Sequence, residues 1–168
     1  NAYNLGKRIE NDSAKLLIFE NDLLTIDFPK NLIHESDTTY IESGLLFNIV
    51  DGVAGSLTND GNIVRYSLSI ARYNKELTTN ESFHLDTLKR NLNQRFAHNN
   101  LQLLDLAEIE IQGIRGLKYV EKKGEYFEKT VMLPLDNNVI AINMKGRDSV
   151  NFLFEDIIKS MKIKNALQ

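Results

Sequence analysis

The last third of the chain constrains its fold more than any other part. Three apolar segments lie at residues 114–121, 125–133 and 138–144, and turn-forming residues separate them at 122–124 and 136–138. Short apolar segments joined by Gly, Asn and Asp are typical of antiparallel hairpins, because these residues tolerate the backbone conformations of tight turns. The pattern therefore predicts a meander of three antiparallel strands.

An amphipathic helix is predicted to close the chain. Asp148 or Ser149 can accept a hydrogen bond from a free backbone N–H at its start. Apolar residues then recur three and four positions apart, which places them on one side of a helix. This stripe consists of Val150, Leu153, Phe154, Ile157, Ile158 and Met161. Burying each large apolar side chain contributes about 1.5–3 kcal/mol, so we expect the helix to be essential for folding.

A β-hairpin is predicted near the start of the chain. Residues 15–20 and 23–28 are rich in Leu, Ile and Phe, and Asn21 and Asp22 lie between them. Asn and Asp tolerate the left-handed backbone that tight hairpin turns require. Pro29 should end the second strand, because proline cannot donate a ladder hydrogen bond.

Two further strands are predicted at residues 44–50 and 63–73. The second of them alternates apolar and polar residues, which predicts one buried and one exposed face. Residues 51–62, between the two strands, include Asp-Gly and Asn-Asp-Gly-Asn, which favour turns. We therefore expect residues 51–62 to form a loop that serves as a recognition surface.

A helix is predicted in the middle of the chain. Thr78 and Glu81 have the spacing of a capping box, in which each side chain bonds the other residue's backbone N–H. The helix should end near residues 98–100, and residues 101–112 return to a strand pattern. Its apolar stripe consists of Leu85, Leu88, Leu92 and Phe96.

Together these elements predict an α+β fold. We expect a single antiparallel β-sheet with the mid-chain helix and the C-terminal helix packed on it. The chain has 168 residues, a length that suits one domain. Residues 1–14 are interpreted as a lead-in segment, and residues 15–168 as a single domain.

The composition argues against several classes of protein. Lys and Arg total 20 against 23 Asp and Glu, so the formal charge is −3 and no overall positive field exists to attract nucleic acid. The chain has no cysteine, so it can form neither a disulfide nor a thiolate metal site. No apolar run approaches the ~20 residues that a membrane-spanning helix needs. We expect no nucleic-acid partner and no transmembrane segment in this chain.

The order of these segments resembles a known family. The segments LLTIDFP at 23–29, IQGIRG at 111–116 and IIKSMKI at 157–163 surround a long central strand, a mid-chain helix and a meander. This order resembles the PsbP/Mog-like superfamily, and it is nearest in style to the DcrB-type bacterial envelope lipoproteins. The resemblance extends over residues 15–164 and implies a non-enzymatic domain that binds partner proteins or assists their assembly.

The side chains with catalytic or metal-binding chemistry are scattered. His34, His84 and His98 lie far apart, and none has a second ligand at the spacing of a metal site. Glu108 and Glu110 share one face of a predicted strand and could serve acid–base catalysis, although a solvated strand face explains them more simply. We expect no catalytic residue, no metal and no cofactor.

The leading hypothesis is a non-enzymatic binding or accessory domain of an exported bacterial protein or lipoprotein. The chain begins with Asn1 rather than Met, which is compatible with a lipid-anchored leader, an export signal or a tag upstream. Periplasmic or envelope-anchored localisation is expected, with the cytoplasm as the alternative. The alternative functions are an immunity protein that neutralises a secreted toxin and a carboxylate-based hydrolase. The candidate partner-binding residues are Asp51, Asn59, Asp60, Asn62, Arg65 and Tyr73.

Overall fold

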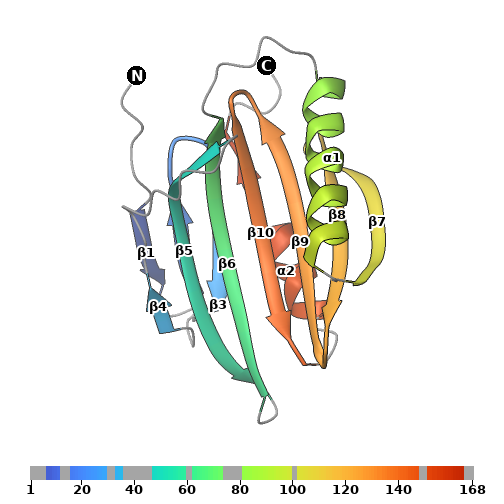
Figure 1. Ribbon diagram of the computed structural model, residues 1–168. Coiled ribbons are helices and arrows are strands. Elements are labelled where there is room, and N and C mark those ends of the chain that lie inside the picture. Colours follow the sequence, from blue (N-terminus) through green and yellow to red (C-terminus); the bar gives the residue numbers. More distant parts are fainter. Residues whose placement is uncertain are drawn as a thin grey trace.

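The described residues form two antiparallel sheets and two helices (Figure 1). The computed structural model describes residues 7–11, 16–29, 33–35, 47–59, 62–73, 81–99, 102–147 and 151–164. The elements are β1 (Lys7–Asn11), β2 (Leu16–Glu20), β3 (Leu24–Pro29), β4 (Ile33–Glu35), β5 (Phe47–Asn59), β6 (Asn62–Tyr73), α1 (Glu81–Asn99), β7 (Gln102–Ile111), β8 (Ile114–Lys123), β9 (Tyr126–Leu135), β10 (Asn138–Gly146), α2 (Asn151–Ser160) and β11 (Lys162–Ile163).

The predicted single sheet is wrong. The described strands form a small sheet in the order β1-β2-β3-β11 and a large sheet in the order β4-β5-β6-β10-β9-β8-β7. The N-terminal hairpin pairs with β1 and with the C-terminal β11, and not with the large sheet. Its apolar side chains instead face the large sheet, so the hairpin adds a second layer to the core. This hairpin core consists of Phe19, Leu24, Ile26 and Phe28.

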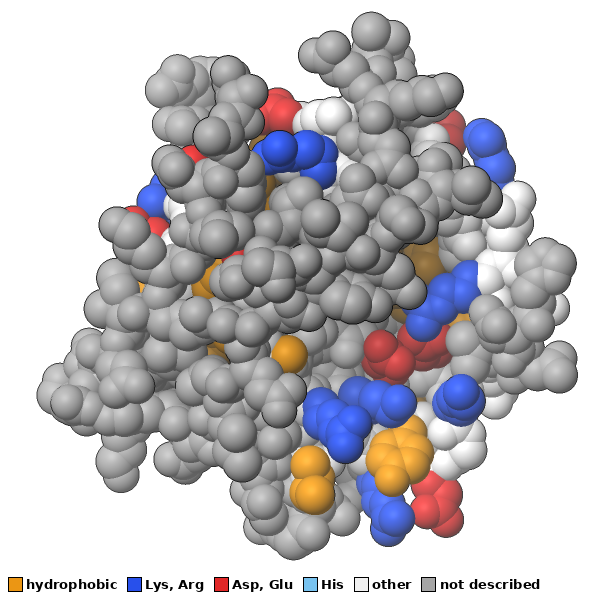
Figure 2. Space-filling model, turned by 60° about the vertical axis from the view of Figure 1, so that its left-hand side comes forward, with side chains coloured by type: hydrophobic (Ala, Val, Ile, Leu, Met, Phe, Trp, Pro, Cys, Tyr) orange, Lys and Arg blue, Asp and Glu red, His pale blue; other side chains and the backbone are white. Residues whose placement is uncertain are grey.

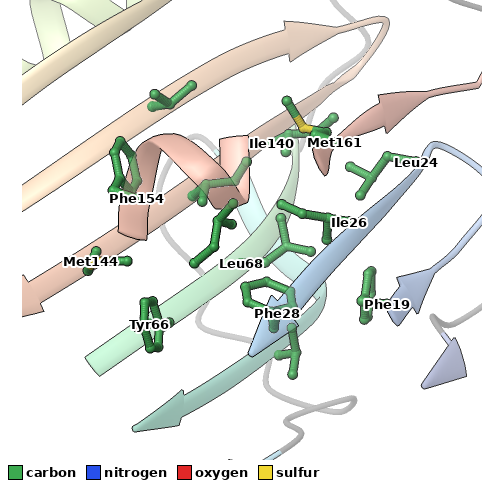
Figure 3. Packing of buried hydrophobic residues seen from close by; sticks show 14 of the residues in the cluster. Phe19, Leu24, Ile26, Phe28, Tyr66, Leu68, Ile140, Met144, Phe154 and Met161 are labelled. Carbon is green, nitrogen blue, oxygen red and sulfur yellow. The ribbon is translucent and has the colours of Figure 1, made fainter. Parts of the chain in front are cut away.

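The main core lies between the small sheet, α2 and one face of the large sheet. Figure 3 shows Phe28 of the small sheet, Leu68 of β6 and Phe154 of α2 within this cluster. Helix α2 is tied to the small sheet, because the backbone N–H of Asp27 donates to Ser160 Oγ at 3.0 Å. The helix therefore closes the core beside the hairpin, as its apolar stripe predicts. The proposed N-cap residues Asp148 and Ser149 lie outside the described residues.

The opposite face of the large sheet carries α1. Its predicted apolar stripe is buried, and Leu85, Leu88 and Leu92 pack against Leu117 and Tyr119 of β8. The predicted mid-chain helix is confirmed, whereas Thr78 of its predicted capping box lies outside the described residues. The large sheet thus has helical or sheet layers on both faces. No described helix is long and apolar enough to cross a membrane.

The predicted meander is confirmed as β8, β9 and β10. Ahead of it, Gln112 and Gly113 form the turn from β7 with φ values of 52° and 83°, which fits a two-residue hairpin with glycine second. The Gln112 side chain also accepts from the backbone N–H of Ile163 at 2.9 Å. This turn therefore fastens β11 and the end of α2 to the edge of the large sheet.

The expected loop at residues 51–62 is also wrong, because residues 51–59 belong to the long strand β5. Val53 pairs with Leu68 and Leu57 with Val64, so β5 follows β6 to the Asn59 and Asn62 pair. Gly52 does not mark a turn. A Cβ added there would come within 2.6 Å of the Leu68 carbonyl oxygen, so glycine permits close approach to β6.

Candidate functional site

The α1 side of the large sheet is polar where α1 does not cover it. In Figure 1, α1 lies in front of β8 and β9, and the lower parts of β6 and β10 extend beyond it. Side-chain exposure on this face increases along β6 with distance from α1. Ala71 is buried near α1, Ser67 and Ser69 are half-buried, and Arg65 is exposed. Ile63 follows at the same face and is 61% exposed.

Strand register places charged residues in a row across this face. Arg65 of β6 pairs with Lys145 of β10, and Lys145 pairs with Glu128 of β9. Glu128 in turn pairs with Glu121 of β8. Directly opposite residues have Cβ atoms about 4.5–5.5 Å apart, so each charge lies within reach of the next. The three strands of the meander and the more distant β6 thus build one polar surface.

A pocket of about 190 Å³ lies at one end of this row. Three strands and the C-terminal part of α1 form its walls. The lining residues are Arg95, Glu121, Lys123, Tyr126, Glu128 and Lys145. We call this group the polar pocket.

Glu121 is the most buried charged residue of the polar pocket. The residue is 2% exposed, and its Oε1 accepts from Arg95 Nη2 at 3.2 Å. Its Oε2 is buried and has no hydrogen-bond partner among the described residues. Burial raises the pKa of the Glu121 carboxyl, and nearby Arg95 opposes the shift while Glu128 adds to it. The pocket therefore contains a buried acceptor oxygen that still needs a proton or a donor.

The other carboxylate of the pocket is held in place. Asn143 Nδ2 donates to Glu128 Oε1 at 2.6 Å and to Thr130 Oγ1 at 2.8 Å. Thr130 lies between Glu128 and Met132 along the same face of β9, and it is buried. This network fixes the direction of the Glu128 side chain before any ligand arrives.

Cations surround an exposed aromatic ring at the rim of the pocket. Tyr126 is 43% exposed, Lys145 Nζ lies 5.6 Å from its ring centroid, and the Arg147 guanidinium carbon lies 5.8 Å from it. Both distances suit cation–π interactions. Figure 2 shows Lys and Arg side chains gathered around exposed hydrophobic side chains in the lower right of the view, with acidic side chains beside them.

Of the sequence-predicted partner-binding residues, Arg65 lies on this face and Asp51 does not. Asp51 is 1% exposed; its Oδ1 accepts from the Gly52 N–H at 2.8 Å, and its Oδ2 from Asn21 Nδ2 at 3.4 Å. Asp51 therefore links the turn of the N-terminal hairpin to β5, inside the protein.

The other predicted residues are spread along β5 and β6. Asn59 and Asn62 form the last pair of these strands, and Tyr73 lies at the opposite end of β6, where it pairs with Phe47. The side chains of Asn59, Asn62 and Tyr73 lie outside the described residues, as does the whole of Asp60. The strand register thus separates Tyr73 from Arg65 by the length of β6.

Glu108 and Glu110 lie on the exposed face of β7, at the edge of the sheet. Glu108 is bonded to Lys89 of α1 and to Arg115 Nη2 at 2.9 Å. The hydrogen bond from Lys89, followed by that from Arg115, lowers the pKa of Glu108. A carboxyl group kept ionised in this way is poorly suited to act as a general acid. The pair therefore fits a surface ion-pair role better than catalysis.

The histidines do not meet in a described metal site. His34 lies in β4, and His84 and His98 lie in α1, but their side chains lie outside the described residues. Among the side chains that the structure describes, no group of three or more His, Asp or Glu residues could hold a metal ion.

Sequence reasoning missed most of the polar pocket, although one signal was present. Leu117 and Tyr119 alternate along β8 on the face under α1, and the next residue on that face is Glu121. A carboxylate that continues an apolar alternation is costly to bury, so it indicates a functional or paired group. The contact of Glu121 with Arg95 of α1 could not be found from the sequence.

Comparisons with known proteins identify the fold. No family model and no curated protein matches the chain. The solution structure of cyanobacterial PsbP (CyanoP) from Synechocystis sp. PCC 6803 matches with a TM-score of 0.54 and 12% identity, over 94% of this chain and 92% of that chain. Similarity at this identity concerns the fold alone. The chain therefore has a PsbP-like fold, as its order of segments predicted.

Proposed function

We propose that this protein is a non-enzymatic accessory domain that binds another protein through the α1 side of its large sheet. The observation that carries the proposal is a basic, partly aromatic surface: Lys123 and Lys145 lie beside Tyr126, and Arg65 lies opposite Lys145 on the neighbouring strand. Tyr and Arg are enriched at protein interfaces, where Tyr contributes a large apolar area with a polar end. We call these four residues the basic face.

The charges on the basic face favour an acidic partner. Arg65, Lys123 and Lys145 make no ion pair within the described part of the chain, whereas Lys118 and Lys129 on the opposite face are paired with Glu155. The whole chain has a formal charge of −3, so the basic face is a local exception. Complementary charge of this kind steers a partner into one orientation and raises the association rate.

The proposed setting is a bacterial exported protein or lipoprotein, in the periplasm or at the envelope. Support for this setting comes from the PsbP-like fold and from the resemblance to the PsbP/Mog-like superfamily, whose members bind partners. The DcrB-type branch is the proposed relative. The role of Glu108 in two ion pairs adds support for binding over hydrolysis at that pair.

The test is capture of the partner followed by measured binding of charge-reversed variants. The wild-type domain would be immobilised, the envelope fraction of the source organism applied, and the captured protein identified by mass spectrometry. In binding assays with that purified partner, Arg65→Glu with Lys145→Glu should weaken affinity about tenfold or more, mainly through slower association. The loss should shrink at high salt, because screening weakens the attraction.

Two matched variants act as controls. Lys162→Glu reverses an exposed charge on β11, away from the basic face, and should bind as the wild type does. Glu108→Ala with Glu110→Ala should also leave binding unchanged. Equal affinity of the wild type and the Arg65/Lys145 variant would refute the proposed surface. A captured secreted toxin that the domain inactivates would establish the immunity alternative.

A further inference from the structure

The polar pocket combines two carboxyl groups with two lysines. Glu121 Oε2 is buried without a hydrogen-bond partner in the described structure, while Oε1 of the same carboxyl is engaged by Arg95. Lys123 and Lys145 also line the pocket, and neither makes a salt bridge to a described carboxylate. The carboxyl groups of Glu121 and Glu128 lie on directly paired residues, so a cationic donor bound beside them relieves their mutual repulsion.

The two carboxylates and the two lysines are brought together by pairing between β8, β9 and β10. Glu121 pairs with Glu128, and Glu128 pairs with Lys145. Lys123 pairs with Tyr126 at the start of β9. One part of the pocket is therefore acidic and the neighbouring part is basic, with the Tyr126 ring beside the basic part.

The size of the pocket limits the ligand. A volume of about 190 Å³ corresponds to roughly six water molecules at ~30 Å³ each. Drug-sized ligands usually occupy pockets of about 300–1,000 Å³, so a molecule held entirely within this pocket is smaller than these. The carboxyl groups and lysines of the walls favour a molecule that carries a cationic donor and an anionic acceptor close together.

We propose that the polar pocket binds a free α-amino acid as its zwitterion. The ammonium group donates to the Glu128 carboxylate, beside that of Glu121, and the carboxylate accepts from Lys145 and Lys123. Arg95 keeps its bond to Glu121 Oε1 and orients that carboxyl. The Tyr126 ring borders the ligand's side chain. The pocket shares Lys123, Lys145 and Tyr126 with the basic face, but this binding requires no partner protein.

The preorganised polar groups explain how a small ligand can bind. Asn143 already orients Glu128, and Arg95 already orients Glu121. Because these side chains are ordered beforehand, binding costs less conformational entropy. Charge-assisted hydrogen bonds are also stronger than neutral ones, which favours a zwitterion over a neutral molecule of the same size.

The proposal can be tested by titrating the domain with each of the standard amino acids in turn. Isothermal titration calorimetry would give affinity, and NMR shifts would locate the site. We expect at least one amino acid to bind and to shift the resonances of Tyr126 and Glu121. The matching carboxylic acid without the amine and the amine without the carboxylate should each bind about tenfold or more weakly.

Variants separate this site from binding elsewhere. Glu121→Gln keeps an oxygen for Arg95 but removes the charge, and Lys145→Gln removes a cation from a half-buried position. Each should weaken amino-acid affinity about tenfold or more. Glu125→Gln, at an exposed turn outside the pocket lining, should bind as the wild type does. If Glu121→Gln does not fold, Lys145→Gln and the ligand analogues still decide the question.

Three results would overturn the proposal: no binding of any amino acid to the wild type, equal binding by the Lys145→Gln variant, or equal affinity for the analogue that lacks the amine. The last result would identify a simple anion site. Each result is obtained without a partner protein, so it is independent of the capture experiment on the basic face.

Discussion

The two faces of the large sheet are built from the same strands but covered in different ways. The face toward the small sheet and α2 is apolar through the middle of β6, where Val64, Tyr66, Leu68 and Ile70 are all buried. The face toward α1 is apolar only beneath that helix, and it becomes charged where the helix stops covering it. The first face holds the layers of the protein together, and the second leaves room for binding.

The alternation of apolar and polar residues along a strand therefore does not by itself define a binding surface. Every second residue of a strand faces the same way, so both faces are equally well specified by the backbone. Their roles differ because of the layer packed on each. Polar groups persist on the α1 side because cross-strand partners satisfy them in part, as Asn143 does for Glu128.

Removing α2 and β11 from the apolar face should have the largest effect on folding stability. A chain that ends at Gly146 lacks α2 and β11, so the core residues Leu24, Ile26 and Leu68 lose part of their cover. We expect this truncation to be insoluble or to lack a cooperative thermal transition. Asp156→Ala changes an exposed residue of α2 and should melt as the wild type does. A soluble truncation with a cooperative transition would contradict the assigned role of α2.

Cavities created on the two faces should lower the free energy of unfolding by different amounts. Leu68 is enclosed by the small sheet and α2, whereas Leu92 packs between α1 and the sheet. Leu→Ala in a core costs about 2–5 kcal/mol, and less where the surroundings can collapse. We expect Leu68→Ala near the upper end and Leu92→Ala near the lower end, since a single helix can shift toward the sheet. Urea unfolding of both variants measures this, and an equal or larger loss for Leu92→Ala would refute the contrast.

The smallest expected effect is a pH dependence of folding stability that has opposite signs for carboxyl groups on the two faces. On the α2 side, the hydrogen bond from Lys118 lowers the pKa of Glu155 despite partial burial. The stability that ionised Glu155 contributes should be present at pH values above its usual pKa of 4.5. It should be lost as pH falls through the pKa of Glu155 in the folded protein. On the α1 side, burial raises the pKa of Glu121. Its contribution should be present below 4.5 and lost as pH rises through the folded pKa.

Glu155→Gln and Glu121→Gln isolate these two contributions. The free energy of unfolding would be measured for both variants and the wild type from acid to neutral pH. The wild type should gain stability over Glu155→Gln as pH rises, by about 0.2–1 kcal/mol for so exposed an ion pair. It should lose stability relative to Glu121→Gln over the same rise. Slopes of the same sign for both comparisons would contradict the assignment.

Much of the fold was predictable because its signals are local. At the N-terminal hairpin, Asn21 Oδ1 accepts from the N–H groups of Leu23 and Leu24 at 2.8 and 3.0 Å, which is the turn chemistry that the residue type indicates. The stripe of α1 follows from helical periodicity in the same way. These features depend on neighbours a few residues apart in the chain.

The errors concern residues whose meaning depends on distant partners. Gly52 favours a turn when read locally, yet in the protein it permits close approach to the Leu68 carbonyl. Aspartate is common in loops, yet Asp51 lies in a strand and accepts a hydrogen bond from Asn21 of the N-terminal hairpin turn. The single-sheet expectation was wrong because nothing local distinguishes a hairpin that extends a sheet from one that packs over it.

The sequence by itself determined the order of elements, the apolar stripes of both helices and the meander. These follow from side-chain periodicity and turn residues, which act within a few positions of the chain. Only the tertiary structure showed that the described strands form two sheets, that Asp51 is buried, and that Arg65 of β6 and Arg95 of α1 lie beside the meander residues Lys145 and Glu121. The tight turns of the meander set the register of its own strands, whereas contacts between elements distant in the chain depend on the packing of whole layers, which a local pattern does not encode.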